Sequence, residues 1–155
     1  MKTCASVLLS LLLSGCAVDR LIPPNPPSTA VSFARGSVSA ELAATRTARA
    51  TGLMNRASLG PGSGMLFVFG ADQNPAFSGF YMKGTSIPLS IAFIDASQRV
   101  VGIQDMTPFD TVSIHRSGVP YRYALEVNQG WFAANAVTAG ASAIFVIPTG
   151  TVIDP

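Results

Sequence analysis

The sequence has few charged residues and few of the side chains that most often perform catalysis. Charged residues make up 12% of the 155 residues, and there is one histidine, one tryptophan and two cysteines. The formal charge of +2 comes from 10 basic and 8 acidic residues, which do not form clusters. Because nucleic-acid binding requires a concentrated positive surface, no nucleic-acid partner is expected.

The scarcity of histidine and glutamate limits the hydrolytic chemistry that the chain could perform. His115 lies in a turn-like stretch, and no serine sits in a Gly-x-Ser-x-Gly pattern. Glu41 and Glu126 are the only glutamates, and no motif pairs them across a glycosidic bond. The glycine-rich residues 60–64 lack the lysine of a phosphate-binding loop. We therefore assign no catalytic residue, no metal site and no cofactor.

Both cysteines lie near the amino terminus, where the sequence is typical of an exported protein. A positive start is followed by an apolar run much shorter than the ~20 residues of a membrane-spanning helix. The run ends in Leu13-Ser14-Gly15-Cys16, which resembles the bacterial lipobox, whose cysteine carries a diacylglyceryl group and an N-acyl chain such as palmitate. We expect a lipoprotein signal peptide at residues 1–15 and lipidation of Cys16. An ordinary signal peptide with a chance cysteine is the alternative.

Processing before Cys16 would decide the location of the mature protein. Cys4 is removed, so no free thiol remains for a disulfide, a metal or a nucleophile. Two acyl chains give stable membrane anchoring. The residue after Cys16 is Ala17 and not Asp, which by resemblance to the sorting rule of enteric bacteria favours the outer membrane, facing the periplasm, over retention in the inner membrane. Residues 16–34 contain four prolines and are expected to form an extended spacer. Residues 35–155 are expected to form a single domain.

Short apolar or alternating runs between turn residues predict a β-rich domain. Strands are expected at residues 38–42, 65–69, 77–83, 89–94, 99–106, 121–127 and 142–147. Thr45 should cap a helix over residues 46–54, and residues 129–136 should form one or two helical turns. Gly79 indicates a bulge or a close-packing point, and the alternation in 121–127 directs Arg122 and Glu126 outward. The pattern predicts a mainly β, compact single-domain barrel or sandwich of about seven strands with one or two short helices.

Several long blocks follow one another in a defined order. They are Gly52-Leu53-Met54-Asn55-Arg56, Gly64-Met65-Leu66-Phe67-Val68-Phe69, Tyr81-Met82-Lys83-Gly84-Thr85-Ser86-Ile87-Pro88-Leu89-Ser90-Ile91-Ala92-Phe93-Ile94-Asp95, Tyr121-Arg122-Tyr123-Ala124-Leu125-Glu126-Val127 and Gly130-Trp131-Phe132. Over residues 38–145 the chain resembles domain-of-unknown-function family 192. The resemblance implies a mainly β barrel-like or sandwich domain, often exported in bacteria, and no established activity.

The chain departs from the usual pattern of that family at polar positions. Tyr81 stands where the family usually has Trp, Gly84 where it has Asn, and Ser90 where it has Asp. Residues 107–120 replace a loop that usually contains cysteine. Each change removes polar or redox capacity from the region where the resemblance would place a site.

Six side chains are candidates for a ligand-binding site: Arg56, Tyr81, Lys83, Thr85, Arg122 and Glu126. Guanidinium and ammonium groups suit an anionic ligand, and Glu126 could pair with either arginine. The simpler interpretation is that Lys83 is solvated and Arg56 forms a structural ion pair.

The favoured hypothesis is an uncharacterised lipid-anchored cell-envelope domain that is not catalytic and binds a small ligand, a glycan or an envelope protein. The alternative is a small envelope hydrolase that uses Lys83, Glu126 or His115. A cavity shared by Lys83, Arg56 and Glu126 would favour ligand binding, whereas a strongly perturbed carboxyl beside a cleft would favour an enzyme. A flat apolar patch would favour a protein partner.

Overall fold

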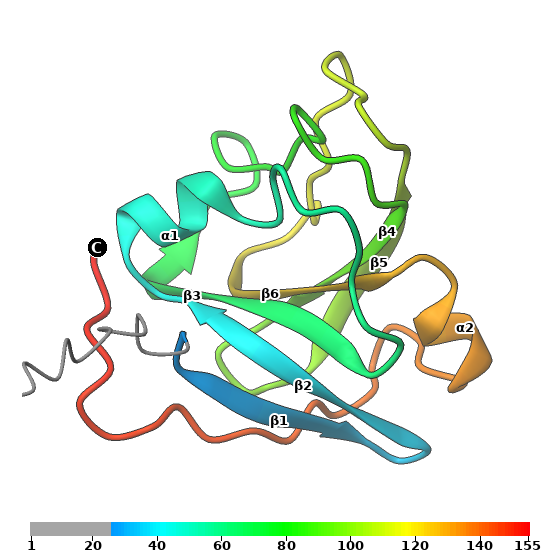
Figure 1. Cartoon of the computed structure of the whole chain (residues 1–155). Helices are drawn as coiled ribbons and strands as arrows, with labels where there is room; N and C mark the ends of the chain where they lie inside the picture. The colour runs from blue at the N-terminus through cyan, green and yellow to red at the C-terminus, as the bar shows by residue number, and fades with distance from the viewer. Residues whose placement is uncertain (1–25) are drawn as a thin grey trace, which may run out of the picture.

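The computed structural model describes residues 26–155, which form one mixed β-sheet and two short helices (Figure 1). The strands are β1 (Ser28–Phe33), β2 (Gly36–Ala43), β3 (Ser63–Gln73), β4 (Leu89–Ile94), β5 (Val100–Met106) and β6 (Tyr121–Asn128), and the helices are α1 (Arg46–Thr51) and α2 (Trp131–Ala134). The strand order is β1-β2-β3-β6-β4-β5. The predicted mainly β, single-domain fold is confirmed, as six strands in a single sheet that does not close into a barrel.

The two faces of the sheet bury separate apolar clusters. One cluster contains Leu66, Leu125 and Val127, and it packs against the carboxyl-terminal part of the chain, including Phe132. The other contains Met65, Phe67 and residues of the loop before β4. Since β4 and β6 lie inside the sheet with both faces covered, every residue of β4 is buried.

Helix α1 connects the two parallel strands β2 and β3. The Thr45 hydroxyl accepts a hydrogen bond from the Ala48 amide at 3.1 Å, so the predicted cap is confirmed. Gly52 follows the last helical residue with a φ of 49°, a value that glycine adopts at little cost. The helix therefore ends at Thr51 rather than at residue 54.

Two predicted strands are absent from the described residues. Residues 77–83 form a loop in which only Phe80 makes a bridge, to His115. The side chains of Phe80 and Met82 pack into the apolar cluster on this face of the sheet, whereas Phe77 is exposed. A Cβ on Gly79 would lie 2.5 Å from a methyl carbon of Ile114, so the prediction of close packing at this glycine is confirmed.

Residues 142–147 also fail to form a strand, and they contribute only isolated bridges to the rest of the sheet. Ser32 of β1 and Ile144 exchange two backbone hydrogen bonds, at 2.9 and 2.8 Å. Val100 of β5 exchanges backbone hydrogen bonds with Ala141 and Gly140, at 2.9 and 2.7 Å. One irregular segment thus contacts both outer strands of the sheet.

The folded domain begins earlier than expected. Strand β1 pairs along its whole length with β2, although its residues lie in the range 16–34 assigned to the spacer. The signal peptide at 1–15 and the lipidation site Cys16 lie outside the described residues. Within residues 26–155, no helix combines the length and apolar character needed to cross a membrane.

Candidate functional site

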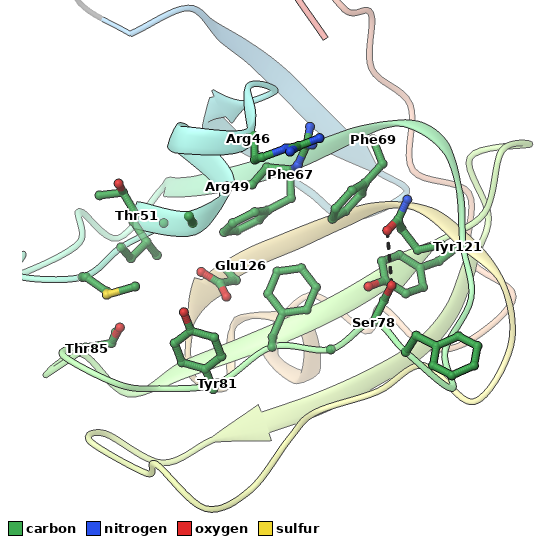
Figure 2. A pocket seen from close by; sticks show the side chains of 18 residues that line it. Arg46, Arg49, Thr51, Phe67, Phe69, Ser78, Tyr81, Thr85, Tyr121 and Glu126 are labelled. Carbon is green, nitrogen blue, oxygen red and sulfur yellow. Dashed lines mark hydrogen bonds between the residues drawn. The ribbon is translucent and has the colours of Figure 1, made fainter. Parts of the chain in front are cut away.

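A cavity of about 320 Å³ lies between helix α1, strands β3 and β6, and the loop that precedes β4 (Figure 2). Its walls are largely aromatic, and Phe67 and Phe69 of β3, Phe80 and Tyr81 of the loop, and Tyr121 of β6 contribute to them. Polar side chains line it as well, and a combination of apolar walls and polar groups is typical of small-molecule sites. They include those of Arg46, Arg49, Thr51, Gln73, Ser78, Thr85 and Glu126.

Glu126 projects its carboxyl group into this cavity from the middle of the sheet (Figure 2). Its strand neighbours are Met65 on β3 and Ile91 on β4, and both belong to the apolar cluster on that face. The residue is only 5% exposed, and no side-chain hydrogen bond joins its carboxyl to another residue within 26–155. Burial raises the pKa of Glu126 to about 8. At neutral pH the group is therefore mainly an uncharged carboxylic acid.

Two hydroxyl groups accompany this carboxyl. Thr85 is buried and Tyr81 is 45% exposed, and both line the same cavity. Figure 2 shows the Tyr81 hydroxyl directed toward Glu126. A ligand atom near Glu126 could therefore contact a carboxylic acid and a phenol together.

The other end of the cavity carries the guanidinium groups of Arg46 and Arg49. Arg49 lies 5.0 Å from the centre of the Phe69 ring, within the range of a cation–π contact. Its nitrogens also donate to the carbonyl oxygens of Ala44 at 2.5 Å, Val68 at 3.0 Å and Asp154 at 3.1 Å. Most of its donors are therefore already engaged with the protein.

The aromatic side chains around the cavity pack against one another. The Phe67 and Phe80 rings meet edge to face at 4.9 Å between centroids, and the Phe69 and Tyr121 rings at 5.7 Å. Burial raises the pKa of Tyr121 to about 12, although a hydrogen bond with Ser78 acts in the opposite direction. Tyr121 is therefore uncharged throughout the physiological range, and Glu126 is the group of this wall that titrates near neutral pH.

The structure divides the six candidate residues into two groups. Tyr81, Thr85 and Glu126 line the cavity, and the prediction that Glu126 faces outward is wrong because β6 lies inside the sheet with both faces covered. Lys83 is exposed and does not line the cavity.

Both candidate arginines lie outside the cavity in ion pairs. Arg56 makes two hydrogen bonds of 2.5 Å with the Glu41 carboxylate, and this pair lowers the pKa of Glu41. The Arg122 guanidinium donates to Asp72 at 2.9 Å. Glu126 therefore pairs with neither arginine, and the structure does not assemble the expected group of cations.

His115 does not line the cavity, although its backbone pairs with that of Phe80, which does. Its Nδ1 lies 3.2 Å from Oε1 of Gln104, and its buried Nε2 has no hydrogen-bond partner among the described residues. Within residues 26–155, no three His, Cys, Asp or Glu side chains gather in a way that could hold a metal ion.

Sequence reasoning missed the arginine end and the aromatic walls of the cavity. The alternation of Met65, Phe67 and Phe69 was a usable signal, because residues two apart on a strand share one face.

The comparisons with known proteins agree with this fold. Two crystal structures are similar to the chain, each at 30% identity over 76% of it. One is of a provisionally described transcription regulator from Sinorhizobium meliloti 1021, with a TM-score of 0.68 and 92% of that protein covered. The other is of a protein of unknown function from Novosphingobium aromaticivorans DSM 12444, with a TM-score of 0.66 and 83% covered.

The comparison with sequence families gives the same assignment as the sequence blocks. No curated protein matches the chain significantly. Residues 29–145 match the model of a family described as "DUF192: Uncharacterized ACR". The matched range includes all six strands except the first residue of β1. On this match, the chain belongs to the DUF192 family.

Proposed function

We propose that this protein is a lipid-anchored, non-catalytic domain of the cell envelope that binds a small organic ligand in the cavity beside Glu126. One observation carries the binding proposal: the carboxyl group of Glu126, a residue only 5% exposed, points into a cavity that several aromatic side chains line. A carboxyl in such a place is poorly hydrated, so a ligand group that hydrogen-bonds to it gains binding energy there.

The cavity suits a ligand with a compact apolar body and one polar group. The rings of Phe67, Phe69 and Phe80 offer apolar contact, and Glu126, Tyr81 and Thr85 offer polar contact. Such a division of apolar walls and a few convergent polar groups is typical of sites that recognise small molecules.

A ligand screen with matched variants tests the binding proposal. The full chain is screened against a library of small aromatic and aliphatic compounds by ligand-observed NMR. Hits should lose affinity in Glu126→Gln and Thr85→Val, which change the cavity lining, and should keep it in Lys83→Ala, an exposed site outside the cavity. Hits that depend on Lys83 and ignore Glu126 would refute the assignment of the site.

The membrane anchor rests on the sequence of the amino terminus. The Leu13-Ser14-Gly15-Cys16 segment favours lipidation of Cys16, and Ala17 favours the outer membrane, facing the periplasm. Two or more acyl chains give stable attachment. In a detergent phase-separation assay, Cys16→Ala should move the protein from the detergent phase to the aqueous phase. Unchanged partitioning would contradict the anchor.

General acid–base catalysis by Glu126 is a second candidate, favoured by its pKa of about 8. Lys83 and His115 do not line the cavity, so an envelope hydrolase would depend on Glu126. Ester and amide substrates should then be turned over with a rate that Glu126→Gln abolishes. We do not propose a regulatory role of the kind named for the Sinorhizobium meliloti protein, because this chain has no basic cluster.

A further inference from the structure

The polar end of the cavity contains an acid without a matching cation. Glu126 is the acidic residue of the lining, and its strand neighbours Met65 and Ile91 are apolar. Arg46 and Arg49 line the same cavity from α1, but among the described residues neither forms an ion pair with Glu126, and burial is the cause of the raised pKa of its carboxyl. A ligand cation could therefore pair with this carboxyl without displacing a cation of the protein.

The aromatic walls favour a cation at the same place. The cavity already holds one cation against a ring, since the Arg49 guanidinium lies 5.0 Å from the centroid of Phe69. Phe67, Phe80 and Tyr81 present further aromatic surface to the same cavity. An ammonium group beside such rings gains from their quadrupoles, and a carboxylate adds a charge-assisted hydrogen bond.

We propose that the ligand is a small organic amine, whose ammonium group pairs with the Glu126 carboxylate while its apolar body lies against the aromatic walls. This inference rests on the proposed ligand-binding function and names its substrate class. Tyr81 and Thr85 supply hydroxyl oxygens that can accept the remaining N–H donors. The cavity would thus satisfy all three donors of a primary ammonium.

Binding of an ammonium ion is coupled to loss of a proton. Below the pKa of Glu126 the free protein holds a carboxylic acid, which must release its proton to solvent when the ammonium ion enters and the ion pair forms. The other titratable or charged groups that line the cavity are Arg46, Arg49, Tyr81 and Tyr121. Burial raises the pKa of Tyr121 to about 12, so its phenol is uncharged at pH 7. The Arg56–Glu41 pair lies beyond Met65 in the same row of the sheet and is already neutralised.

Three probes with one aromatic body test the charge class of the ligand: 2-phenylethylamine, 2-phenylethanol and phenylacetate. With the full chain at pH 7, titration calorimetry should detect binding of the amine, with close to one proton released per amine bound when buffers of different ionisation enthalpy are compared. Glu126→Gln should weaken the affinity for the amine by about tenfold or more, because a charge-assisted contact is lost. Lys83→Ala, the matched exposed control, should leave this affinity unchanged.

The other outcomes separate this inference from the proposed function. If the alcohol or the carboxylate binds in a Glu126-dependent way and the amine does not, the site stands and the amine class is refuted. Amine binding that survives Glu126→Gln, or that releases no proton, also refutes the inference. If none of the three probes binds, the amine inference is overturned, and the library screen decides on the proposed function separately.

Discussion

Replacing Glu126 with glutamine should stabilise the protein and remove most of the pH dependence that Glu126 causes. Burial raises the pKa of this carboxyl from its ordinary value of 4.5 to about 8. The acid is neutral in both the folded and unfolded states below pH 4.5, so it carries no penalty there. As the pH rises from 4.5 to 8, the unfolded chain loses the proton while the folded protein retains it. The unfolded state is therefore increasingly favoured.

The size of the effect follows from the shift in pKa. Each unit is worth about 1.4 kcal/mol, so the penalty grows to about 3 kcal/mol at pH 7 and levels off at about 5 kcal/mol above pH 8. Glutamine has nearly the same shape and cannot ionise. Burying the glutamine amide has a cost that does not depend on pH. That cost therefore does not affect how the stability difference between the two proteins changes with pH. Between pH 5 and pH 8 the stability difference should change by about 3 kcal/mol in favour of Glu126→Gln.

Urea denaturation between pH 5 and pH 9 measures this difference. Trp131, the single tryptophan, reports on unfolding because its ring packs against Phe33 and Phe132. Glu41→Gln is the matched control, since Arg56 lowers the pKa of Glu41 and this replacement should cost stability at neutral pH. If Glu126→Gln and the unmodified protein keep parallel stability profiles over the whole range, the carboxyl ionises normally in the fold and the reasoning is refuted.

Three further predictions concern the core, the helix cap and one loop. Phe93→Ala should lower the free energy of unfolding by about 3–5 kcal/mol, because Phe93 is fully buried; a loss below about 1 kcal/mol would contradict its place in the core. Thr45→Ala should cost about 1 kcal/mol in urea denaturation, since the hydroxyl accepts from the Ala48 amide; an unchanged midpoint would contradict the cap. Hydrogen bonds from Ser113 lower the pKa of Asp110 to about 2, so carbon-13 NMR should find Asp110 largely ionised at pH 3. An ordinary midpoint near pH 4 would argue against that loop geometry.

Strands inside the sheet were predictable from the sequence where both faces are covered. Residues 89–94 are apolar except for Ser90, and β4 has the predicted bounds. For β6 the sequence gives a wrong prediction, because alternating apolar and polar residues usually indicate a strand with one face exposed to solvent. Glu126 lies on a face of the sheet that helix α1 and the loop before β4 cover. The residues next to Glu126 in the sequence do not indicate that this face is covered.

The loop before β4 shows why apolar runs alone do not predict strands. Residues 77–83 have the composition of a strand, yet Phe80 and Met82 fill the cluster beneath α1 while their backbone makes almost no ladder. Long-range packing decides this conformation, and a single sequence does not report it.

About half of the candidate site was predictable, and the division has a physical origin. Tyr81, Thr85 and Glu126 were found through sequence blocks, and the structure places them on one cavity. Arg56 and Arg122 were chosen as cations available for a ligand, but each has a nearby carboxylate in the fold. Pairing of charges from distant parts of the chain is set by the register of the strands, which composition does not specify.

The irregular segment 140–147 has a consequence for self-association, because it hydrogen-bonds to Ser32 of β1 through Ile144 and to Val100 of β5 through Ala141. Strands β1 and β5 are the two ends of an open sheet, and unpaired amides and carbonyls on such ends can recruit a strand from another molecule. A single stretch of chain occupies part of both ends. Its displacement would expose amides and carbonyls on both edges at once, and sheets exposed in this way can add to one another without closing. The same few backbone hydrogen bonds therefore protect the sheet against strand addition at both edges.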